Sequence, residues 1–270
     1  MVQTVERCPL ERRRQMLKIL EEKGSVSVKE LSELLNISKV SVRSHLKRLE
    51  EEGLLIRMRG GAVIPNRSRL ELTFAIRERL NIEEKRLIGE AAAQLVQDGE
   101  SIILDASTTA LQVAKRIKDR QYLTVVTNGI YTALELAGCP NITVMLLGGV
   151  LRAPSMSLVG PQAEEAISRL HVDRGFFSCR GLTLEAGLCD ANIHEVQLKR
   201  AMVRACKEVT ALVDYSKIGA VSFASFAPVE ALHRIITDDR APDAYLASFR
   251  DRGIEVVVCA HKRPFSRKEE

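Results

Sequence analysis

The sequence lacks the features that mark secreted, membrane-spanning or metal-binding proteins. Its six cysteines are scattered, and no two of them stand in a Cys-x-x-Cys spacing. Buried thiols in a reducing compartment are therefore expected rather than disulfides or a zinc site. The chain shows no signal-peptide pattern and no unbroken apolar run of about 18 residues, the length that a membrane-spanning helix needs. We expect a cytoplasmic protein that uses no metal, no cofactor and no membrane partner.

The sequence also lacks internal repeats, and its charge is unevenly placed. With 270 residues, of which 46% are hydrophobic, it can form one large domain or two moderate ones. Residues 1–60 hold 13 basic and 9 acidic side chains, so this quarter of the chain carries +4 of the net charge of +5. A basic segment on a nearly neutral remainder favours a DNA-binding domain joined to a domain with a different partner.

Residues 25–61 have the pattern of a helix-turn-helix with a wing. Apolar residues at helical spacing predict one helix over 28–35 and a second over 39–52, which Gly53 ends. Asn36 tolerates a left-handed backbone and Ser38 can cap the second helix, so the two helices are joined by a tight turn. An earlier helix is expected over 11–23. The run 54–63 indicates a β-hairpin whose turn is Gly60-Gly61.

The second helix is sized for the DNA major groove, and its exposed face carries groups that contact bases and phosphates. An ordinary three-helix packing unit with a solvated charged face is the alternative. The apolar spacing, the turn and the arginines of the hairpin together favour DNA binding. The predicted DNA-binding residues are Ser38, Lys39, Ser41, Arg43, Ser44, Lys47, Arg57 and Arg59.

From residue 101 onward, short β-rich runs alternate with helical stretches. This alternation predicts a mostly parallel sheet covered on both faces. The strands are expected at 101–105, 123–127, 142–147, 174–178, 209–213, 234–237 and 254–259. The helices are expected at 81–96, 110–118, 130–137, 161–170, 195–206 and 242–252, the first of them capped by Asn81 and Glu84.

Parallel sheets bind ligands at the carboxyl ends of their strands, and several of these ends are polar or glycine-rich. Hydroxyls where a helix begins favour a bound phosphate, although simple helix capping or a turn requirement would explain the same residues. The residues in question are Asp105, Ser107, Thr108, Thr109, Asn128, Gly148, Gly149, Arg152 and Lys217. Glu195 and Lys199 stand four apart and would by themselves indicate a surface ion pair, and His171 and His194 are expected to be ordinary polar residues.

The chain resembles the DeoR family of transcriptional regulators over nearly its whole length. Residues 24–62 match the family's winged helix-turn-helix signature, and the segments LDASTTA, VVTNG, LLGGVLR, SLVGPQAEEAI, EAGLCD and VDYSKIG match its sensor domain in order. The resemblance implies a cytoplasmic repressor of a carbohydrate operon whose sensor, with a fold similar to ribose-5-phosphate isomerase or coenzyme A transferase, binds a phosphorylated sugar. It also implies operator DNA as partner and self-association as a dimer or higher oligomer.

Two departures from the family pattern bear on specificity. The family commonly has Arg-Arg-Asp-Leu in the recognition helix, where this chain has Arg43-Ser44-His45-Leu46, so a different operator preference is expected. The family's sensor often has Gly-x-Asp-Gly where residues 178–181 are Ser-Cys-Arg-Gly. Arg180 there implies either a more anionic effector or an altered or lost response. Arg180 and Glu195 complete the predicted effector-binding set.

The expected organisation is a winged helix-turn-helix domain over 9–64 (motif at 26–45), a linker at 65–80, a sensor over 81–260 and a charged tail at 261–270. Alternating apolar residues in 69–80 indicate a strand or an extended connector. A sugar-phosphate isomerase fused to a DNA-binding module is the alternative function, since a carboxylate base and a cation are offered by Asp105, Asp190, Glu195 and Lys217. A redox or metal sensor is disfavoured by the cysteine spacing. We predict no catalytic residues.

Overall fold

The computed structural model describes residues 9–23, 25–51, 54–58, 60–63 and 74–260. The chain divides into two compact units, Met1–Ile76 and Arg77–Glu270. The predictions for Gly53, Arg59 and the charged tail fall outside the described residues, as does most of the expected linker. The expected domain bounds themselves stay a prediction.

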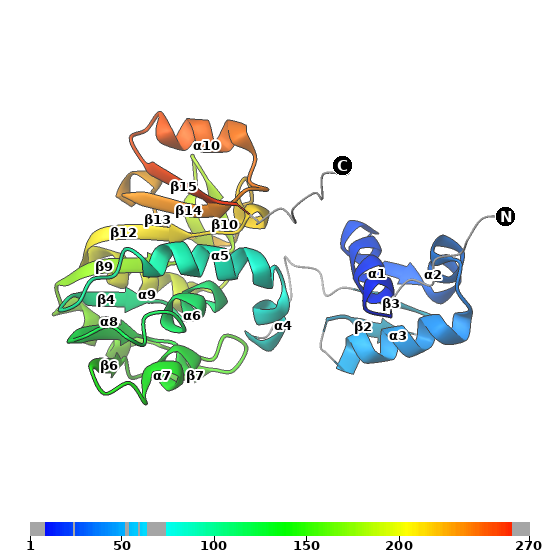
Figure 1. Ribbon diagram of the computed structural model, residues 1–270, viewed down its shortest axis with the longest axis horizontal. Coiled ribbons are helices and arrows are strands. Elements are labelled where there is room, and N and C mark those ends of the chain that lie inside the picture. Colours follow the sequence, from blue (N-terminus) through cyan, green and yellow to red (C-terminus); the bar gives the residue numbers. More distant parts are fainter. Residues whose placement is uncertain (1–8, 24, 52–53, 59, 64–73, 261–270) are drawn as a thin grey trace, which may run out of the picture. The chain divides into compact units, whose positions relative to one another are not determined.

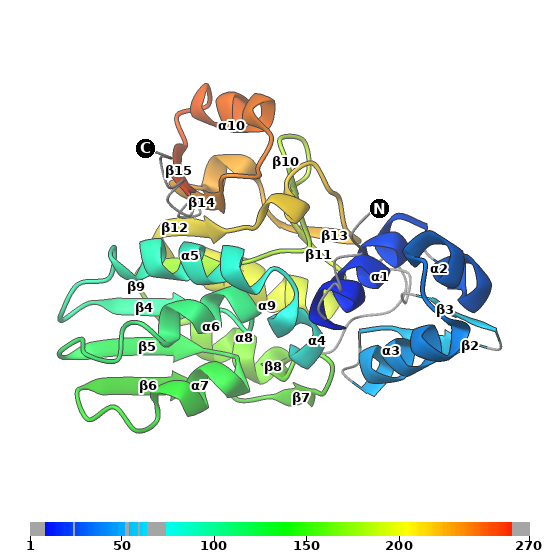
Figure 2. The same cartoon turned by 45° about the vertical axis from the view of Figure 1, so that its right-hand side comes forward.

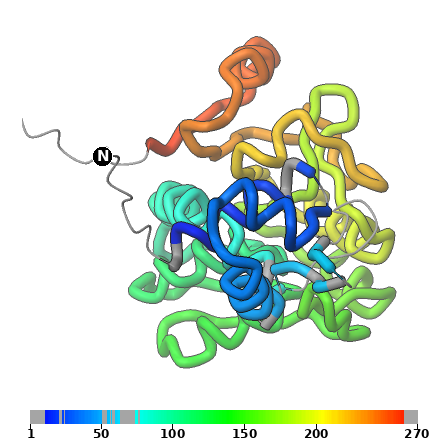
Figure 3. Tube along the Cα trace, turned by 90° about the vertical axis from the view of Figure 1, so that its right-hand side faces the viewer, coloured from blue at the N-terminus to red at the C-terminus, as the bar shows by residue number. Residues whose placement is uncertain are grey.

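The N-terminal unit is a three-helix winged fold, traced in blue in Figure 3. Its elements are α1 (Pro9–Lys23), β1 (Ser25–Ser27), α2 (Val28–Leu35), α3 (Lys39–Glu51), β2 (Ile56–Met58) and β3 (Gly61–Val63). The hairpin β2–β3 is antiparallel, and β1 adds to its other side in the order β1-β3-β2. Val42, Leu46 and Leu49 of α3 are almost fully buried with Met16 and Leu20 of α1. The predicted helices and hairpin are therefore confirmed, except that Gly61, predicted to lie in the turn, is the first residue of β3 and pairs with Met58.

The C-terminal unit is built on a seven-stranded sheet whose neighbouring strands are all parallel, which confirms the predicted fold class (Figure 1). The strand order is β15-β14-β12-β9-β4-β5-β6. The strands are β4 (Ser101–Leu104), β5 (Leu123–Thr127), β6 (Ile142–Leu146), β9 (Val172–Phe177), β12 (Cys206–Leu212), β14 (Arg234–Asp238) and β15 (Glu255–Cys259).

Helices cover both faces of this sheet. α5, α6 and α7 pack in a row on one face, whereas α8 and α9 pack together on the other (Figures 1 and 2). The helices are α5 (Ile82–Ala93), α6 (Thr108–Ala114), α7 (Ile130–Leu136), α8 (Pro161–Ser168), α9 (Ile193–Arg204) and α10 (Asp243–Arg250). The central strand β4 is apolar throughout its buried part because both of its faces are covered.

Five short antiparallel strands lie outside the main sheet and were not predicted. They form the pair β7 (Val150–Arg152) and β8 (Ser157–Val159), and the sheet β10 (Gly181–Thr183), β11 (Gly187–Asp190) and β13 (Ala224–Ala227). Runs of three or four residues are too short to show a period in the sequence.

Two expectations near the start of this unit were wrong. Residues 74–79, placed in a strand or extended connector, form the helix α4 (Phe74–Arg79). Asn81 does precede α5, but its backbone is left-handed with φ 50° and its side chain makes no capping bond. Instead, the Asn81 amide donates to Asp214 and the Glu84 carboxylate pairs with Arg240. Partners distant in sequence thus replaced the local capping box.

The chain enters the sheet at its centre. It runs from β4 outward through β5 to β6, and then returns to the other side of β4 with β9 before continuing to β12, β14 and β15. The direction of strand addition therefore reverses between β4 and β9. Ligand sites of open parallel sheets lie at the carboxyl ends of strands at such a reversal, which here are Asp105 and Ser178.

Candidate functional site

The turn between α2 and α3 is held by local bonds that the sequence specifies. Ser27 and Glu30 form a reciprocal capping box at the start of α2, with N–H···O distances of 3.1 and 3.0 Å. Asn36 adopts the predicted left-handed backbone, with φ 51°. Ser38 accepts a hydrogen bond from the Ser41 amide at 3.1 Å and so caps α3. The capping box thus fixes the start of α2, whereas Asn36 and Ser38 form the turn into α3.

The outer face of α3 presents the predicted basic side chains. Lys39, Arg43, Ser44 and Lys47 are exposed, whereas Ser41 is only half-exposed. Val40, which was not among the predicted DNA-binding residues, lies on the same helix and is 73% exposed. An exposed apolar residue beside Arg43 suits contact with a thymine methyl group in the major groove.

His45, one of the departures from the family pattern, lies on a different side of the helix. It is half-buried, and Arg12, Arg13 and Arg48 surround it. Burial lowers the pKa of this imidazole, and the three guanidiniums lower it further. His45 therefore belongs to the packing between α1 and α3 rather than to the exposed face.

Arg57 of the wing is tied to the recognition helix. Its backbone N–H donates to the Glu50 carboxylate at 3.0 Å, and its guanidinium lies 3.7 Å from the same carboxylate. About 40% of each side chain remains exposed, so the ion pair contributes little to stability. The companion Arg59 lies outside the described residues.

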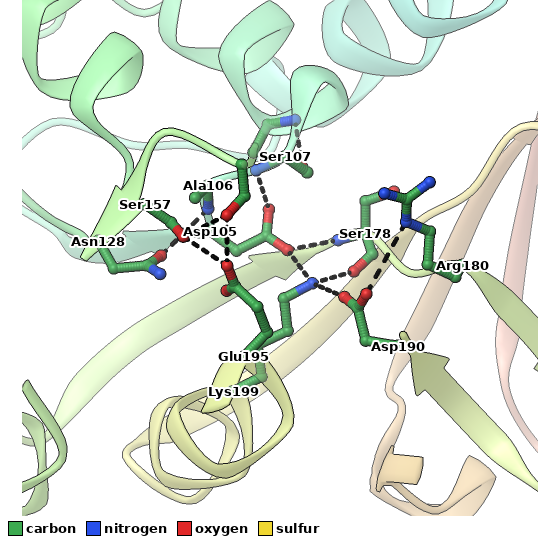
Figure 4. A network of polar contacts seen from close by, with 12 residues as sticks. Asp105, Ala106, Ser107, Asn128, Ser157, Ser178, Arg180, Asp190, Glu195 and Lys199 are labelled. Atoms are coloured by element: carbon green, nitrogen blue, oxygen red, sulfur yellow. Dashed lines mark hydrogen bonds and ion pairs between the residues drawn. The ribbon is translucent and has the colours of Figure 1, made fainter. Parts of the chain in front are cut away.

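In the C-terminal unit, a buried ionic network occupies the reversal point of the sheet (Figure 4). The Lys199 ammonium, from α9, lies 3.0 Å from Asp105 at the end of β4 and 2.8 Å from Asp190 at the end of β11. It also donates to the Ser178 carbonyl at 2.8 Å. The Asp105 carboxylate is fully buried and accepts from the backbone N–H groups of Ser107 and Ser178 at 3.1 and 3.0 Å.

The electrostatics of this network favour the charged forms. Burial alone would lower the pKa of Lys199, but the carboxylates of Asp105 and Asp190 outweigh burial and raise that pKa above its ordinary value. Burial likewise opposes ionisation of Asp190, yet Lys199 holds the pKa of Asp190 below its usual value. The network therefore joins the ends of β4, β9 and β11 through one lysine that stays protonated.

A second buried cluster surrounds Glu195, one turn before Lys199 on α9. Its carboxylate accepts from Arg152 at 3.0 Å and from Ser155 at 2.8 Å, and it also contacts the Ser157 hydroxyl. Glu195 and Lys199 are each about 5% exposed or less. The surface-pair interpretation of these two residues is therefore wrong, because each of them has separate buried partners on the loops at the strand ends.

The other predicted effector-binding residues near β4 and β5 are buried or form hydrogen bonds within the protein. Ser107 caps α6 by accepting from Ala110 at 3.0 Å, while Thr108 and Thr109 are buried. The Asn128 side chain accepts from the Ala106 amide at 3.1 Å and donates to the Leu158 carbonyl at 3.2 Å. These bonds fit the capping alternative as well as a ligand loop.

The two glycines after β6 differ from each other. A side chain at Gly149, whose φ is 130°, would approach the Val159 carbonyl to 2.4 Å, so close packing against β8 requires this glycine. A side chain at Gly148 would meet nothing within 4 Å. The space beside Gly148 is open, whereas the space at Gly149 is taken by the protein.

Two partly exposed cations flank this edge of the sheet. Lys217 follows β12, with 26% of its side chain exposed, and its ammonium lies 4.0 Å from Asp214. Arg180 follows β9, with 21% exposed, and lies 3.9 Å from Asp190. Lys85 of α5 lies close enough to both cations for their charges to lower its pKa. Burial lowers the pKa of Lys85 to about 7; Asp214 opposes that shift, and Lys217, Arg77 and Arg180 add to it.

Three members of these clusters, Lys85, Ser155 and Ser157, were not singled out from the sequence. Asp190 and Lys199 stood out as charged residues, but the sequence did not show that they are largely buried. The described residues include no group of three His, Cys, Asp or Glu side chains that could hold a metal ion. No helix among them is both long and apolar enough to cross a bilayer.

Comparison with known proteins gives the same two-part division. A family model described as the DeoR-like helix-turn-helix domain matches residues 12–68, and one described as the DeoR C terminal sensor domain matches residues 80–239. The transcriptional regulator GolR of Listeria innocua is 39% identical over 93% of this chain and 98% of its own. The transcriptional repressor GlcR of Bacillus subtilis is 35% identical over 90% of this chain and 93% of its own.

More distant matches are also found. The glycerol-3-phosphate regulon repressor of Escherichia coli is 27% identical over 90% of this chain and 96% of its own. Among solved structures, the ribose 5-phosphate isomerase of Methanocaldococcus jannaschii matches with a TM-score of 0.38 and 17% identity, covering 51% of this chain and 55% of that one. That score is too low to bear on function.

Proposed function

This chain belongs to the DeoR family of transcriptional regulators, and from that premise we propose that it represses a carbohydrate-utilisation operon from which a phosphorylated sugar releases it. It is a DNA-binding regulator with a sensor domain.

The observation that carries the effector proposal is the set of cations at the carboxyl edge of the sheet. Arg180 and Lys217 are partly exposed, and both act on the buried amine of Lys85 strongly enough to lower its pKa. Like charges held close together repel each other, and a phosphate between them relieves that repulsion. Gly148 leaves open space beside the same set of strand ends. One relative is named for a glycerol-3-phosphate regulon, in line with a small phosphorylated ligand.

For DNA we propose that α3 enters a major groove, with Arg43 and Val40 toward the bases and Lys39, Ser44 and Lys47 toward the phosphates. Two copies related by a two-fold axis read half-sites about 34–36 Å apart. An effector that binds one arrangement of the two copies better than the other shifts the population away from that spacing. A coupling of about 1–3 kcal/mol is ordinary for such regulators.

The test is fluorescence anisotropy of labelled operator DNA in the presence of a panel of sugar phosphates. We expect at least one member to weaken operator binding by the parent protein and to have less effect on Lys217→Met. Arg250→Met, which removes an exposed cation at the end of α10, is the matched control. A panel without any effect on the parent refutes the sugar-phosphate part of the proposal.

We propose no catalytic activity, since the named relatives are regulators. The geometry supports this view: Asp105 is fully enclosed, and Glu195 is buried against Arg152 and two serines, so neither carboxylate stands free as a base. Isomerase turnover by the pure protein that disappears in Glu195→Ala would overturn it. Because a regulator that binds chromosomal operators acts in the cytoplasm, we propose that the protein is cytoplasmic.

We also propose that two copies associate through the edge of the sheet at β6. Six large apolar side chains with 38–67% exposure lie on α7, β6, β7 and their margins: Tyr131, Leu134, Met145, Leu146, Val150 and Leu151. These elements lie side by side in both ribbon views (Figures 1 and 2). Residues 130–151 contain one charged side chain, Glu135, although 28% of the chain is charged, and Lys118 neutralises it.

The second copy of this chain is the occupant that fits this surface. An apolar surface without net charge is complementary to itself, and β6 is the terminal strand of the main sheet. Two such edges pair antiparallel across a two-fold axis. Leu134→Glu together with Val150→Glu is expected to lower the mass in solution toward that of one chain, 30.0 kDa. Val221→Glu with Phe223→Glu, at 67% and 75% exposed positions elsewhere, is the control. A monomeric parent, or equal masses in both variants, contradicts the proposal.

A further inference from the structure

Asn81 and Lys85 hold the segment where the chain enters the sensor, and Lys115 of α6 adds a partly exposed ion pair with Glu78 of α4 at 3.2 Å. In the order of elements α4 follows β3 of the winged fold, and α4 leads through Leu80 and Asn81 into α5. Any signal that passes along the chain from the sensor to the DNA-binding unit passes through α4. The contacts that fix α4 are therefore the contacts through which such a signal is transmitted.

The first contact closes the carboxyl end of α4. The Lys85 ammonium donates to the Leu80 carbonyl at 2.7 Å and also to the Arg77 carbonyl. Only 5% of Lys85 is exposed. The last carbonyls of a helix have no partner within the helix, and a cation there is favourable for the helix dipole. Lys85 thus fastens the end of α4 to α5.

The second contact joins the same turn to the loop after β12. The Asn81 amide donates to the Asp214 carboxylate at 2.9 Å and lies 3.4 Å from the Ser216 hydroxyl. Asp214 is 2% exposed, and it also accepts from the Ser216 backbone N–H at 3.0 Å. Its other oxygen lies 4.0 Å from the Lys217 ammonium. One carboxylate is therefore shared between Asn81, at the entry to the sensor, and Lys217, in the cation set.

Charge links the two contacts. Asp214 favours the protonated form of Lys85, whereas Lys217 and Arg180 oppose it. An anion bound between Lys217 and Arg180 neutralises the two cations that repel Lys85, and it competes with Asp214 for Lys217. Both effects leave Asp214 and the Lys85 ammonium more firmly engaged with the entry segment.

We propose that Asn81 and Lys85 are positioning residues that convert occupancy of the Arg180–Lys217 site into a tighter hold on α4, and so carry the effector signal toward the DNA-binding unit. This inference rests on the proposed effector function. It assigns no ligand contact to Asn81 or Lys85, and it separates binding of the anion from transmission of its effect.

The test compares two variants that remove these contacts with a control variant, at a neighbouring position, that leaves them in place. Asn81→Gly keeps a residue that accepts the left-handed backbone and removes only the amide. Lys85→Met removes the ammonium. Arg86→Met is the matched control, because Arg86 is the next cation on α5, half exposed and paired only locally with Glu83 in the described contacts. Thermal denaturation establishes that each variant is folded.

Two measurements are made on the full chain with ribose 5-phosphate and inorganic phosphate as probes. Hydrogen–deuterium exchange reports protection of α4 and of the 214–217 loop, and anisotropy reports operator affinity. In the parent and Arg86→Met, a probe is expected to protect both segments and to change operator affinity, by about 5- to 150-fold for an ordinary coupling. In Asn81→Gly and Lys85→Met, the 214–217 loop is still protected, but α4 exchange and operator affinity no longer respond.

The outcomes separate this inference from the function on which it rests. If the probes alter the parent's operator affinity and alter that of Asn81→Gly and Lys85→Met equally, the inference is refuted while the effector proposal stands. If neither probe protects the 214–217 loop of the parent or alters its operator affinity, both are refuted for these anions. If the two variants lose loop protection as well, Asn81 and Lys85 belong to the binding site and the positioning role is wrong.

Discussion

Lys199 holds Asp105 at 3.0 Å across the point where the sheet reverses its direction of growth. Both side chains are almost completely buried. Because Lys199 also contacts Asp190 and the Ser178 carbonyl, three strand ends depend on a single ammonium group. The stability of this unit is therefore unusually sensitive to that one side chain.

Replacement of Lys199 by Met is expected to destabilise the C-terminal unit by about 3–5 kcal/mol, because two buried carboxylates lose their counter-charge. Thermal denaturation followed by circular dichroism measures the loss. Lys207→Met is the control, since its ion pair with Asp173 is exposed to solvent and should matter little. A Lys199→Met protein that melts with the parent would show that the network carries no stability.

Reversal of charge on the recognition helix is expected to abolish operator binding and leave the sensor intact. Arg43→Glu with Lys47→Glu removes two cations from the exposed face of α3 and places anions against DNA phosphates. The corresponding alanine variant should reduce the slope of log affinity against log salt by about 0.9 for each lost phosphate contact. Arg169→Glu with Arg250→Glu makes the same charge change on the sensor. Equal operator affinity in both double variants would exclude α3 as the DNA-contacting helix.

The buried amine of Lys85 gives stability a particular pH dependence. Its pKa of about 7 in the folded protein lies below the ordinary value of 10.5, under the influence of burial and of Asp214, Lys217, Arg77 and Arg180. Between these values the unfolded chain binds a proton that the folded chain has released, so this group makes the free energy of unfolding rise with pH. The rise is at most about 1.4 kcal/mol per pH unit.

Denaturant unfolding at several pH values between about 7 and 10 tests this assignment. Lys85→Met should show a smaller increase of stability with pH than the parent, and Arg86→Met should keep the parental slope. A Lys85→Met protein with the parental slope would mean that another group titrates in this window.

The capping box of α2 predicts a smaller effect, confined to the N-terminal unit. Ser27→Ala removes the oxygen that accepts the Glu30 N–H, and should destabilise that unit by about 0.5–2 kcal/mol. As the temperature rises, operator binding by Ser27→Ala should decrease in proportion to the fraction of the N-terminal unit that is still folded. Ser25→Ala, two residues earlier in β1, should behave like the parent in the same melting experiment; a shared loss would indicate that β1 rather than the cap is responsible.

Local patterns were sufficient for most of the architecture. The spacing of Val42, Leu46 and Leu49 specified the buried side of α3, and Asn36 specified the turn, because both effects act within a few residues. The seven strands of the main sheet were found for the same reason: each is a compact β-rich run. Strand order was not predictable, since it depends on pairings between distant segments.

The clusters at the strand ends show where local reasoning stops. Helical spacing places Glu195 and Lys199 on one side of α9, but it does not say whether that side meets water or protein. Their partners, Arg152 of β7 and Asp105 after β4 among them, come from segments that only the folded sheet brings together. Lys85 likewise stands in a charged stretch that resembles a solvated helix face, and its burial follows from the unpredicted helix α4.

The entry of the chain at the middle of its sheet also has a consequence for biosynthesis. β4 is the first strand of the main sheet to leave the ribosome, yet β9 cannot flank it until the segments for β5 and β6 have already been made. The Asp105 carboxylate has no Lys199 counter-ion until α9 has also been synthesised. During translation the nascent sensor must keep its innermost strand half covered for a long interval, so chaperone dependence and slow maturation are expected to distinguish this unit from the small domain that precedes it.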